Sequence, residues 1–169
     1  MSSTNALSQR DVSITREFDA PREIVFRAWI DPEQLGHWFA PRGCTVLFRT
    51  IDPREGGEFH FYIESPNGRA SWCKGAYREL VAPERMVFTM AAADENGAAT
   101  GPTEVGMNPQ WPREAIVTAT FAEICDKTQV TFRRSVAESS AERTRALASW
   151  LEMFDRLGEE LDYLCELAR

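Results

Sequence analysis

Three side chains that could take part in chemistry follow one another in the stretch DPEQLGHWFAP, which runs from Asp31 to Pro41. Histidine changes its charge near neutral pH and is a common proton-transfer group and metal ligand. Tryptophan and phenylalanine provide broad apolar surfaces that suit a core or the wall of a ligand pocket. His37, Trp38 and Phe39 could therefore form part of an active site, the rim of a binding pocket, or core.

The residue types favour a lid over a catalytic triad in this stretch. Tryptophan is highly buried on average, so we expect Trp38 to face the core or a cavity wall. No carboxylate or cysteine lies beside His37 in the sequence, and we expect it at the surface. Phe39 could face either way.

A second group of ionisable side chains lies in the stretch EFHFYIE, where polar and apolar residues alternate. His60, Tyr62 and Glu64 fall on the side opposite the phenylalanines. If this side lines a cavity, His60 could orient a ligand or transfer a proton. If it faces solvent, His60 is a surface residue, and both alternatives stay open.

Sequence motifs of common enzyme classes do not occur in the chain. We find no GxSxG, HExxH, GxxxxGK or GxGxxG. Four cysteines are widely scattered without a CxxC pair, and there are only two histidines, so we expect neither a metal site nor a cofactor. A cysteine nucleophile would need a histidine close in space, which spacing along the sequence cannot test.

Composition limits the class of protein and of partner. A chain of 169 residues fits one domain and can bury roughly 70% of its unfolded surface without a disulfide or metal. Its 43% hydrophobic residues include five Trp and ten Phe, which suit a roomy, aromatic-lined interior. The net charge of -7 argues against nucleic acids and anionic membrane surfaces as partners.

The N-terminal sequence indicates a cytoplasmic protein. It contains no basic region followed by an apolar stretch, and no apolar run in the chain approaches the ~20 residues of a membrane span. Free thiols then imply a reducing compartment. We expect residues 1–10 to form a flexible terminus and residues 11–169 to form a single domain.

The first elements are predicted as a strand followed by two short helices. Apolar residues alternate over DVSITREF, which indicates a half-buried strand. Asp19 is a candidate N-cap for the next helix, with Pro21 near its first position. Asp31 begins a second short helix, and Pro41 ends it because proline blocks helix continuation.

A period of two runs from Cys44 to Arg134 and predicts short antiparallel strands. Phe48 belongs to the apolar set of the first of these strands, and Trp72 begins a later one. Turns are expected at Gly56-Gly57, Ala82-Pro83 and Cys125-Asp126-Lys127, and residues 93–113 form a long loop that we expect to be mobile.

The last element is predicted as a long amphipathic helix over about residues 141–167, ~40 Å in length. Ser139 and Glu142 form a capping-box pattern at its start. Its apolar residues recur at intervals of three and four and form one continuous stripe, which comprises Leu147, Trp150, Phe154, Leu157, Leu161 and Leu164.

These elements predict an α+β fold in which a curved seven-stranded antiparallel sheet wraps around the long C-terminal helix, with two short helices after strand 1. A bent sheet cannot touch a straight helix along its full length, so we expect a cavity between them for a hydrophobic small molecule. The ligand-binding candidates are Trp38, Phe39, Phe48, His60, Tyr62, Trp72, Trp111, Trp150 and Phe154.

The chain resembles the START-like (SRPBCC, birch-pollen-allergen-like) superfamily. Within it, the chain is similar to the family named after the C-terminal domain of the activator of the ninety-kilodalton heat-shock chaperone ATPase. Four stretches carry this resemblance, REFDAPREIVFRAWIDPEQLGHWFAP, REGGEFHF, KGAYRELVAPERMVFT and SWLEMFDRLGEEL. It implies a helix-grip fold with an internal hydrophobic cavity and no metal. Related branches bind lipids, sterols or plant metabolites, and some cyclise polyketides.

Two positions depart from the pattern of this family. Glu55 precedes the glycine pair where proline is frequent. Ala146 and Ser149 stand before Trp150 where bacterial members often carry His-x-x-Gly-Trp, so a role that depends on that histidine is not expected.

Three functions follow as alternatives. The first is binding of a hydrophobic small molecule, and the second is an enzyme of the cyclase, dehydratase or hydrolase type acting on such a molecule. An enzyme would need an ionisable side chain in the pocket, with His60, Tyr62 and Glu64 as first candidates. The third is a chaperone-linked module, which we rank last because only about ten residues precede the first strand. A homodimer through an open sheet edge also stays open.

Overall fold

The computed structural model describes residues 11–100, 114–135 and 140–168. The expected flexible terminus, Trp111, most of the long loop and Ser139 lie outside these residues. The elements follow one another as β1 (Val12–Phe18), α2 (Arg22–Ala28), α3 (Pro32–Trp38), β2 (Thr45–Ile51), β3 (Glu58–Glu64), β4 (Ala70–Val81), β5 (Arg85–Ala92), β6 (Ala115–Ile124), β7 (Lys127–Arg134) and α4 (Ser140–Leu167).

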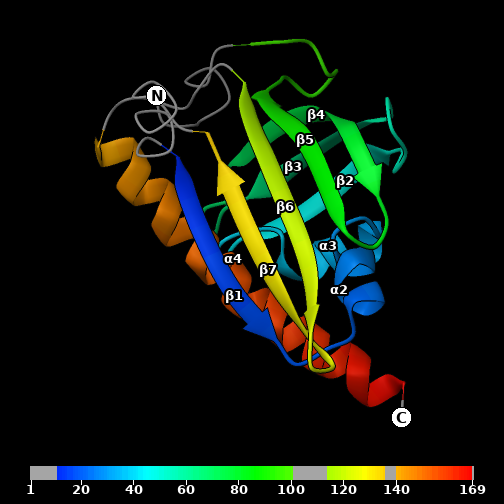
Figure 1. The fold of residues 1–169 in the computed structure, drawn as a ribbon. Coiled ribbons are helices and arrows are strands. Elements are labelled where there is room, and N and C mark those ends of the chain that lie inside the picture. Colours follow the sequence, from blue (N-terminus) through cyan, green and yellow to red (C-terminus); the bar gives the residue numbers. More distant parts are fainter. Residues whose placement is uncertain (1–10, 101–113, 136–139, 169) are drawn as a thin grey trace.

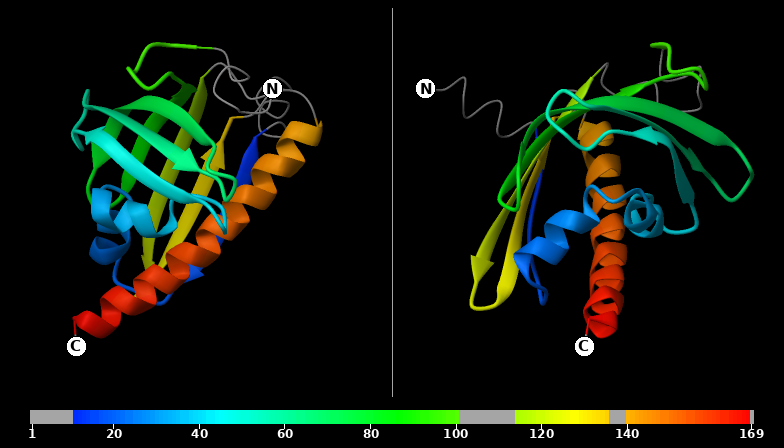
Figure 2. Two further views of the ribbon diagram at one scale, coloured as in Figure 1. Left: turned by 180° about the vertical axis from the view of Figure 1, so that it is seen from behind. Right: turned by 90° about the vertical axis from the view of Figure 1, so that its right-hand side faces the viewer.

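Within the described residues, seven strands form one antiparallel sheet in the order β1-β7-β6-β5-β4-β3-β2. Figure 1 shows α4 running diagonally behind β1, β7 and β6. In the right-hand view of Figure 2, the sheet arches over the upper part of α4, and α2 and α3 lie on the same concave side. The predicted α+β helix-grip fold is therefore confirmed.

The sheet bends where β4 meets β5. The register of this pair shifts between Tyr77 and Glu79. Between the pairs Lys74–Ala91 and Tyr77–Phe88, the backbone N–H of Ala76 donates to the hydroxyl of Thr89. Gly75 lies at this point, where a Cβ would stand 1.8 Å from the Thr89 carbonyl oxygen. The close approach of the two strands therefore requires glycine.

Alternation along the strands sends large apolar side chains to the concave face, as the period of two predicts. In β3, Phe59 and Phe61 are buried, while His60 and Tyr62 are on the other face and half-buried. Rings from α2, β7 and α4 pack together beneath the sheet, with Trp29 in contact with Phe132 and Phe154. This aromatic packing forms the centre of the core.

The two short helices begin where backbone chemistry allows. Pro21, not Asp19, is the N-cap of α2, and no side chain caps this helix, so the prediction for Asp19 was wrong. Proline at this position leaves no backbone N–H without a partner. Asp31 caps α3 as predicted, with its carboxylate accepting from the backbone N–H groups of Glu33 (2.9 Å) and Gln34 (3.1 Å).

Helix α4 buries most of the predicted stripe. Trp150, Phe154, Leu157 and Leu161 are at most 5% exposed, but Leu147 is 37% exposed, so the prediction for Leu147 was wrong. At that turn Ala146 occupies the buried position, because 3.6 residues per turn shift the inner face.

The structure has turns at the positions where the sequence predicts them. Gly56 has a positive φ of 82°, as do Cys125 (49°) and Asp126 (69°) between β6 and β7. The Ala82-Pro83 peptide that joins β4 to β5 is cis.

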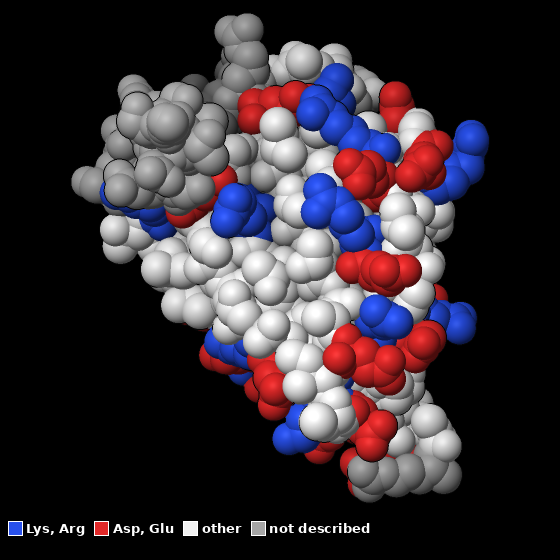
Figure 3. Space-filling view, in the orientation of Figure 1, with Lys and Arg blue, Asp and Glu red and all other residues white. Residues whose placement is uncertain are grey.

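The surface bears mixed charges. On the face shown in Figure 3, Lys and Arg alternate with Asp and Glu along one side, and the region over β1, β7 and β6 is mainly uncharged. No helix in the described part of the chain combines the length and apolar character that crossing a bilayer requires. All four cysteines are free thiols.

Candidate ligand-binding pocket

An inner pocket of ≈ 380 Å³ lies between the concave face of the sheet and the N-terminal half of α4. Its apolar wall comes from the segment after α3, from β3 and β5, and from α4, and comprises Phe39, Pro41, Ile63, Met90, Trp150 and Met153. Half-buried polar residues, Ser65, Ser71 and Ser149, complete the lining together with Cys44, Cys73 and Arg134. The pocket is of the size that small ligands occupy.

Arg134 at the end of β7 is the charged residue in this wall. Its side chain is 3% exposed, and the guanidinium Nη1 donates to the Glu142 carboxylate of α4 at 3.2 Å. Burial lowers the pKa of Arg134, whereas the adjacent carboxylate acts in the opposite direction. The pair therefore places a buried guanidinium at an otherwise largely apolar pocket.

Cys73 on β4 is a buried thiol beside this pair. Burial raises its pKa to about 12, although the Arg134 guanidinium acts to lower it. The thiol is therefore protonated at neutral pH and behaves as a small apolar wall residue, not as a nucleophile.

The segment between α3 and β2 is held against α4 by Arg156. Its guanidinium Nη1 donates to the backbone carbonyls of Ala40 (2.6 Å), Pro41 (3.2 Å) and Cys44 (3.3 Å). Because Pro41 and Cys44 line the inner pocket, Arg156 fixes one side of its mouth.

The neighbouring aromatic compartment is filled by its own side chains. Rings of Phe39, Phe48 and Phe59 enclose a space of only ≈ 10 Å³ together with Trp29, Leu35, Tyr77 and Phe88. This volume is about that of one water probe, so the compartment is core. This compartment therefore does not provide the roomy, aromatic-lined interior that the composition predicts.

The three residues of the lid stretch separate in space. Trp38 is fully buried, and its indole N–H donates to the Ala28 carbonyl at 2.9 Å. Phe39 is also buried and borders the inner pocket. His37 points outward with its side chain 51% exposed, and its Nδ1 lies 2.9 Å from Oε1 of Glu160 on α4. This carboxylate, 123 positions away, could not be recognised as a neighbour from the sequence.

His60, Tyr62 and Trp72 form a separate cluster on the outer face of the sheet. The Trp72 ring lies 4.8 Å from the His60 ring and 4.7 Å from the Tyr62 ring. Arg49 stacks over Trp72, with its guanidinium carbon 5.3 Å from the ring centroid. The sheet separates this cluster from Phe39 and Trp150, so the predicted ligand-binding residues do not form one site.

The remaining predicted site residues contribute in different ways. Trp150 lines the inner pocket, whereas Phe154 and Phe48 pack in the core beside it. Trp111 lies outside the described residues.

Sequence reasoning missed Arg134, Met90 and Met153 as pocket residues. For Arg134 a signal existed, since it continues the inward alternation of Thr128, Val130 and Phe132 along β7. Within the described residues, no group of three or more His, Cys, Asp or Glu side chains could hold a metal ion.

Comparisons with known proteins agree with this architecture. A crystal structure of a protein from Chromobacterium violaceum matches with a TM-score of 0.76 at 22% identity, covering 90% of this chain and 97% of that one. A solution structure of a protein from Arthrobacter aurescens gives 0.79 at 22%, covering 93% and 88%. The structure of the AHSA1 protein from Silicibacter pomeroyi gives 0.71 at 19%, covering 90% and 98%.

These identities establish the fold alone. A comparison with curated proteins found no match. The family model described as Activator of Hsp90 ATPase homolog 1-like protein matches residues 19–162, which is most of the chain and runs from the residue after β1 into α4. The chain therefore belongs to the family of Activator of Hsp90 ATPase homolog 1-like proteins, within the START-like superfamily.

Proposed function

We propose that this protein binds one small, largely apolar molecule in the inner pocket. The observation that carries this proposal is a space of ≈ 380 Å³ with a mainly apolar wall and one buried guanidinium. An apolar ligand would displace water from Phe39, Met90 and Trp150, which is favourable in proportion to the apolar area removed from water.

The wall also indicates where a polar group of the ligand would lie. Arg134 lines the pocket, and a guanidinium carries five N–H donors and no acceptor. A ligand with a hydrogen-bond acceptor or an anionic group at one end would match this position. Fatty acids and aromatic polyketide-like molecules with an acidic or carbonyl group have this character.

Binding is favoured over catalysis because of the chemistry of the lining. Among the described lining residues of the inner pocket, the ionisable side chains are Arg134, Cys44 and Cys73. An acid–base mechanism needs a group that exchanges protons near the working pH, and burial makes Cys73 a very weak acid. The candidates for proton transfer, His60 and Tyr62, are on the outer face.

The family description names a chaperone ATPase, and contact with that chaperone is not part of this proposal. The cytoplasm is the proposed compartment, which the four free thiols support because reducing conditions keep cysteines unpaired.

The proposal is tested with 1-anilinonaphthalene-8-sulfonate, a fluorescent probe that combines aromatic rings with one anionic group. We expect saturable binding at one site per chain, with displacement by fatty acids or aromatic polyketides. In the Ser149→Trp variant the added ring fills the pocket, and the probe affinity should fall about ten-fold or more, equivalent to ~1.4 kcal/mol.

Ala148→Trp provides the matched control, because Ala148 is the adjacent residue of α4 and is exposed. This variant should bind the probe as the unsubstituted chain does. Equal affinity in both variants, with both folded by circular dichroism, would exclude the inner pocket as the binding site.

A further inference from the structure

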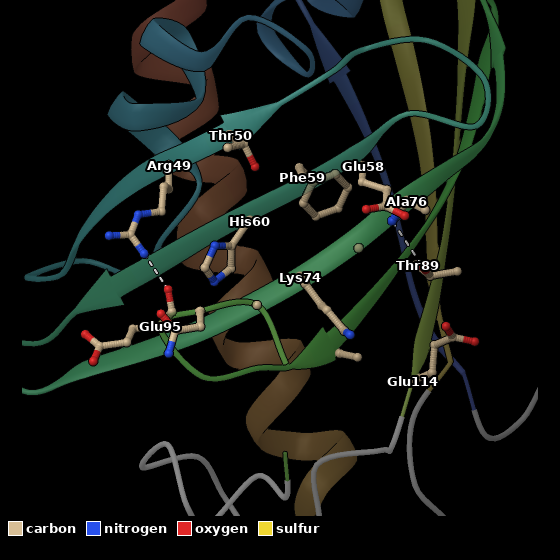
Figure 4. Close-up of a pocket in the computed structure, with 14 residues that line it drawn as sticks. Arg49, Thr50, Glu58, Phe59, His60, Lys74, Ala76, Thr89, Glu95 and Glu114 are labelled. Carbon is tan, nitrogen blue, oxygen red and sulfur yellow. Dashed lines mark hydrogen bonds between the residues drawn. The ribbon is translucent and has the colours of Figure 1, made fainter. Parts of the chain in front are cut away.

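A second pocket, of ≈ 580 Å³, lies on the outer face of the sheet and shares no lining residue with the inner pocket. Figure 4 shows its floor, formed by β3 and β4, with Arg49 and His60 on one side and Thr89 and Glu114 on the other. Its lining is predominantly polar and charged, in contrast to that of the inner pocket. The two spaces therefore suit different ligands.

One wall of this outer pocket is fixed before any ligand arrives. The turn that begins at Asp94 is held by its own carboxylate, which accepts from the backbone N–H groups of Asn96 and Ala98 at 2.9 Å each. His60 Nε2 lies 3.0 Å from the Asp94 carbonyl oxygen, and the Arg49 guanidinium donates to the carbonyl of Glu95. A wall held by several hydrogen bonds loses little conformational entropy when a ligand binds.

A lysine ammonium group projects into this pocket. Lys74 is half-buried on β4, and no described residue forms an ion pair or hydrogen bond with its Nζ. Figure 4 shows its side chain extending toward the side that holds Thr89 and Glu114. A partly buried ammonium group is stabilised by an anion within hydrogen-bonding distance.

Carboxylates surround the same space. Glu58 on β3 lines it and has no ion-pair partner among the described residues, and Glu95 lies on the rim. Glu114 is 3.4 Å from Arg78, but both side chains are about half exposed, and such a pair contributes little. These groups attract a cation while Lys74 attracts an anion.

We propose that the outer pocket binds a small zwitterion of amino-acid or dipeptide size, with its carboxylate at Lys74 and its ammonium group at Glu58. The lining carries three carboxylates and two cationic side chains, Arg49 and Lys74. A simple anion would be repelled by the carboxylates, and a simple cation would leave the lysine charge uncompensated. A ligand that carries both charges satisfies both sides. The pocket volume has room for a molecule of this size.

The test uses alanyl-glutamine and two blocked forms of it. N-acetylation removes the ammonium charge, and a C-terminal amide removes the carboxylate. In NMR titrations of the ¹⁵N-labelled full chain, alanyl-glutamine should shift the backbone amides of Lys74, Ala76, Ala91 and Gly97 saturably. Each blocked form should bind about ten-fold more weakly or worse, because one charge-assisted hydrogen bond is lost.

The chain offers matched control variants. Lys74→Met keeps the apolar stem and removes the charge, so it should abolish these shifts, whereas Lys127→Met alters the only other lysine and should not. Glu58→Gln should weaken binding, while Glu64→Gln at the far end of β3, outside the pocket, should have no effect. The proposal would be overturned if the blocked forms, or the uncharged sugar glucose, bound as tightly as alanyl-glutamine. It would also be overturned if the Lys74→Met variant still bound alanyl-glutamine.

Discussion

The buried Arg134–Glu142 pair is the residue-scale feature that most affects both the fold and the inner pocket. Both side chains are at most 4% exposed, and they join the end of β7 to the first turn of α4. Moving two charges out of water is costly, and their mutual attraction offsets that cost only while both are present. Loss of one partner should therefore be worse than loss of both.

The first prediction concerns this pair. Arg134→Met should lower the free energy of unfolding by about 3–5 kcal/mol, because it leaves the Glu142 carboxylate buried without its main counter-charge. The double variant Arg134→Met/Glu142→Met should recover most of this loss, since two apolar side chains can pack in place of the ion pair. Urea denaturation measures both changes, and a double variant no more stable than the single one would contradict the argument.

Residue types alone could not identify the partners of His37 and His60. Glu160, the partner of His37, lies on α4, and the Asp94 carbonyl near His60 lies in a turn after β5. Alternation along a strand separates its side chains into two sets, one on each face of the sheet. The face that meets the helix is the one that carries the apolar set. For β3 the phenylalanines decide this, and His60 is consequently outside.

At the scale of elements, the position of α3 determines one side of the inner pocket. The helix carries Trp38 into the core and is followed by Phe39 in the pocket wall. Its first turn depends on the Asp31 carboxylate, which satisfies two backbone N–H groups that have no partner within the helix. The cap therefore stabilises an element that supports the site.

Asp31→Ala should lower the free energy of unfolding by about 1 kcal/mol, since both capping bonds are lost. Asp31→Asn keeps a side-chain oxygen at the same position and should stay within a few tenths of a kcal/mol of the unsubstituted chain. Thermal or urea denaturation gives both values. If the two variants were destabilised equally, the cap would not be the cause.

At the scale of the whole molecule, the two pockets lie on opposite faces of the curved sheet. The sheet curls over α4 (Figure 2). The inner pocket is lined from its concave face, and the outer pocket (Figure 4) is lined from the other face of β3 and β4. Gly75 permits the bend, because a Cβ there would meet the Thr89 carbonyl oxygen at 1.8 Å and Cζ of Phe59 at 2.4 Å.

Gly75→Ala should therefore lower the free energy of unfolding by about 3 kcal/mol or more, since a backbone oxygen cannot move aside as a flexible side chain can. Gly36→Ala is the comparison, because the nearest atom to a Cβ there is 3.8 Å away and the residue lies within α3. Alanine favours helix over glycine by up to about 1 kcal/mol, so this variant should be equal or more stable. Similar losses in both would refute the steric explanation.

The sequence by itself determined the order of the strands and helices, the apolar stripe of α4 and the family, because these depend on periodicity and motifs that are local along the chain. Only the tertiary structure decided that the aromatic compartment is filled, that Met90, Arg134 and Ser149 meet in one pocket, and that His60 and Lys74 belong to another. Whether a space stays open depends on side-chain volumes from elements far apart in sequence and on the bend that brings them together. No local pattern contains this information.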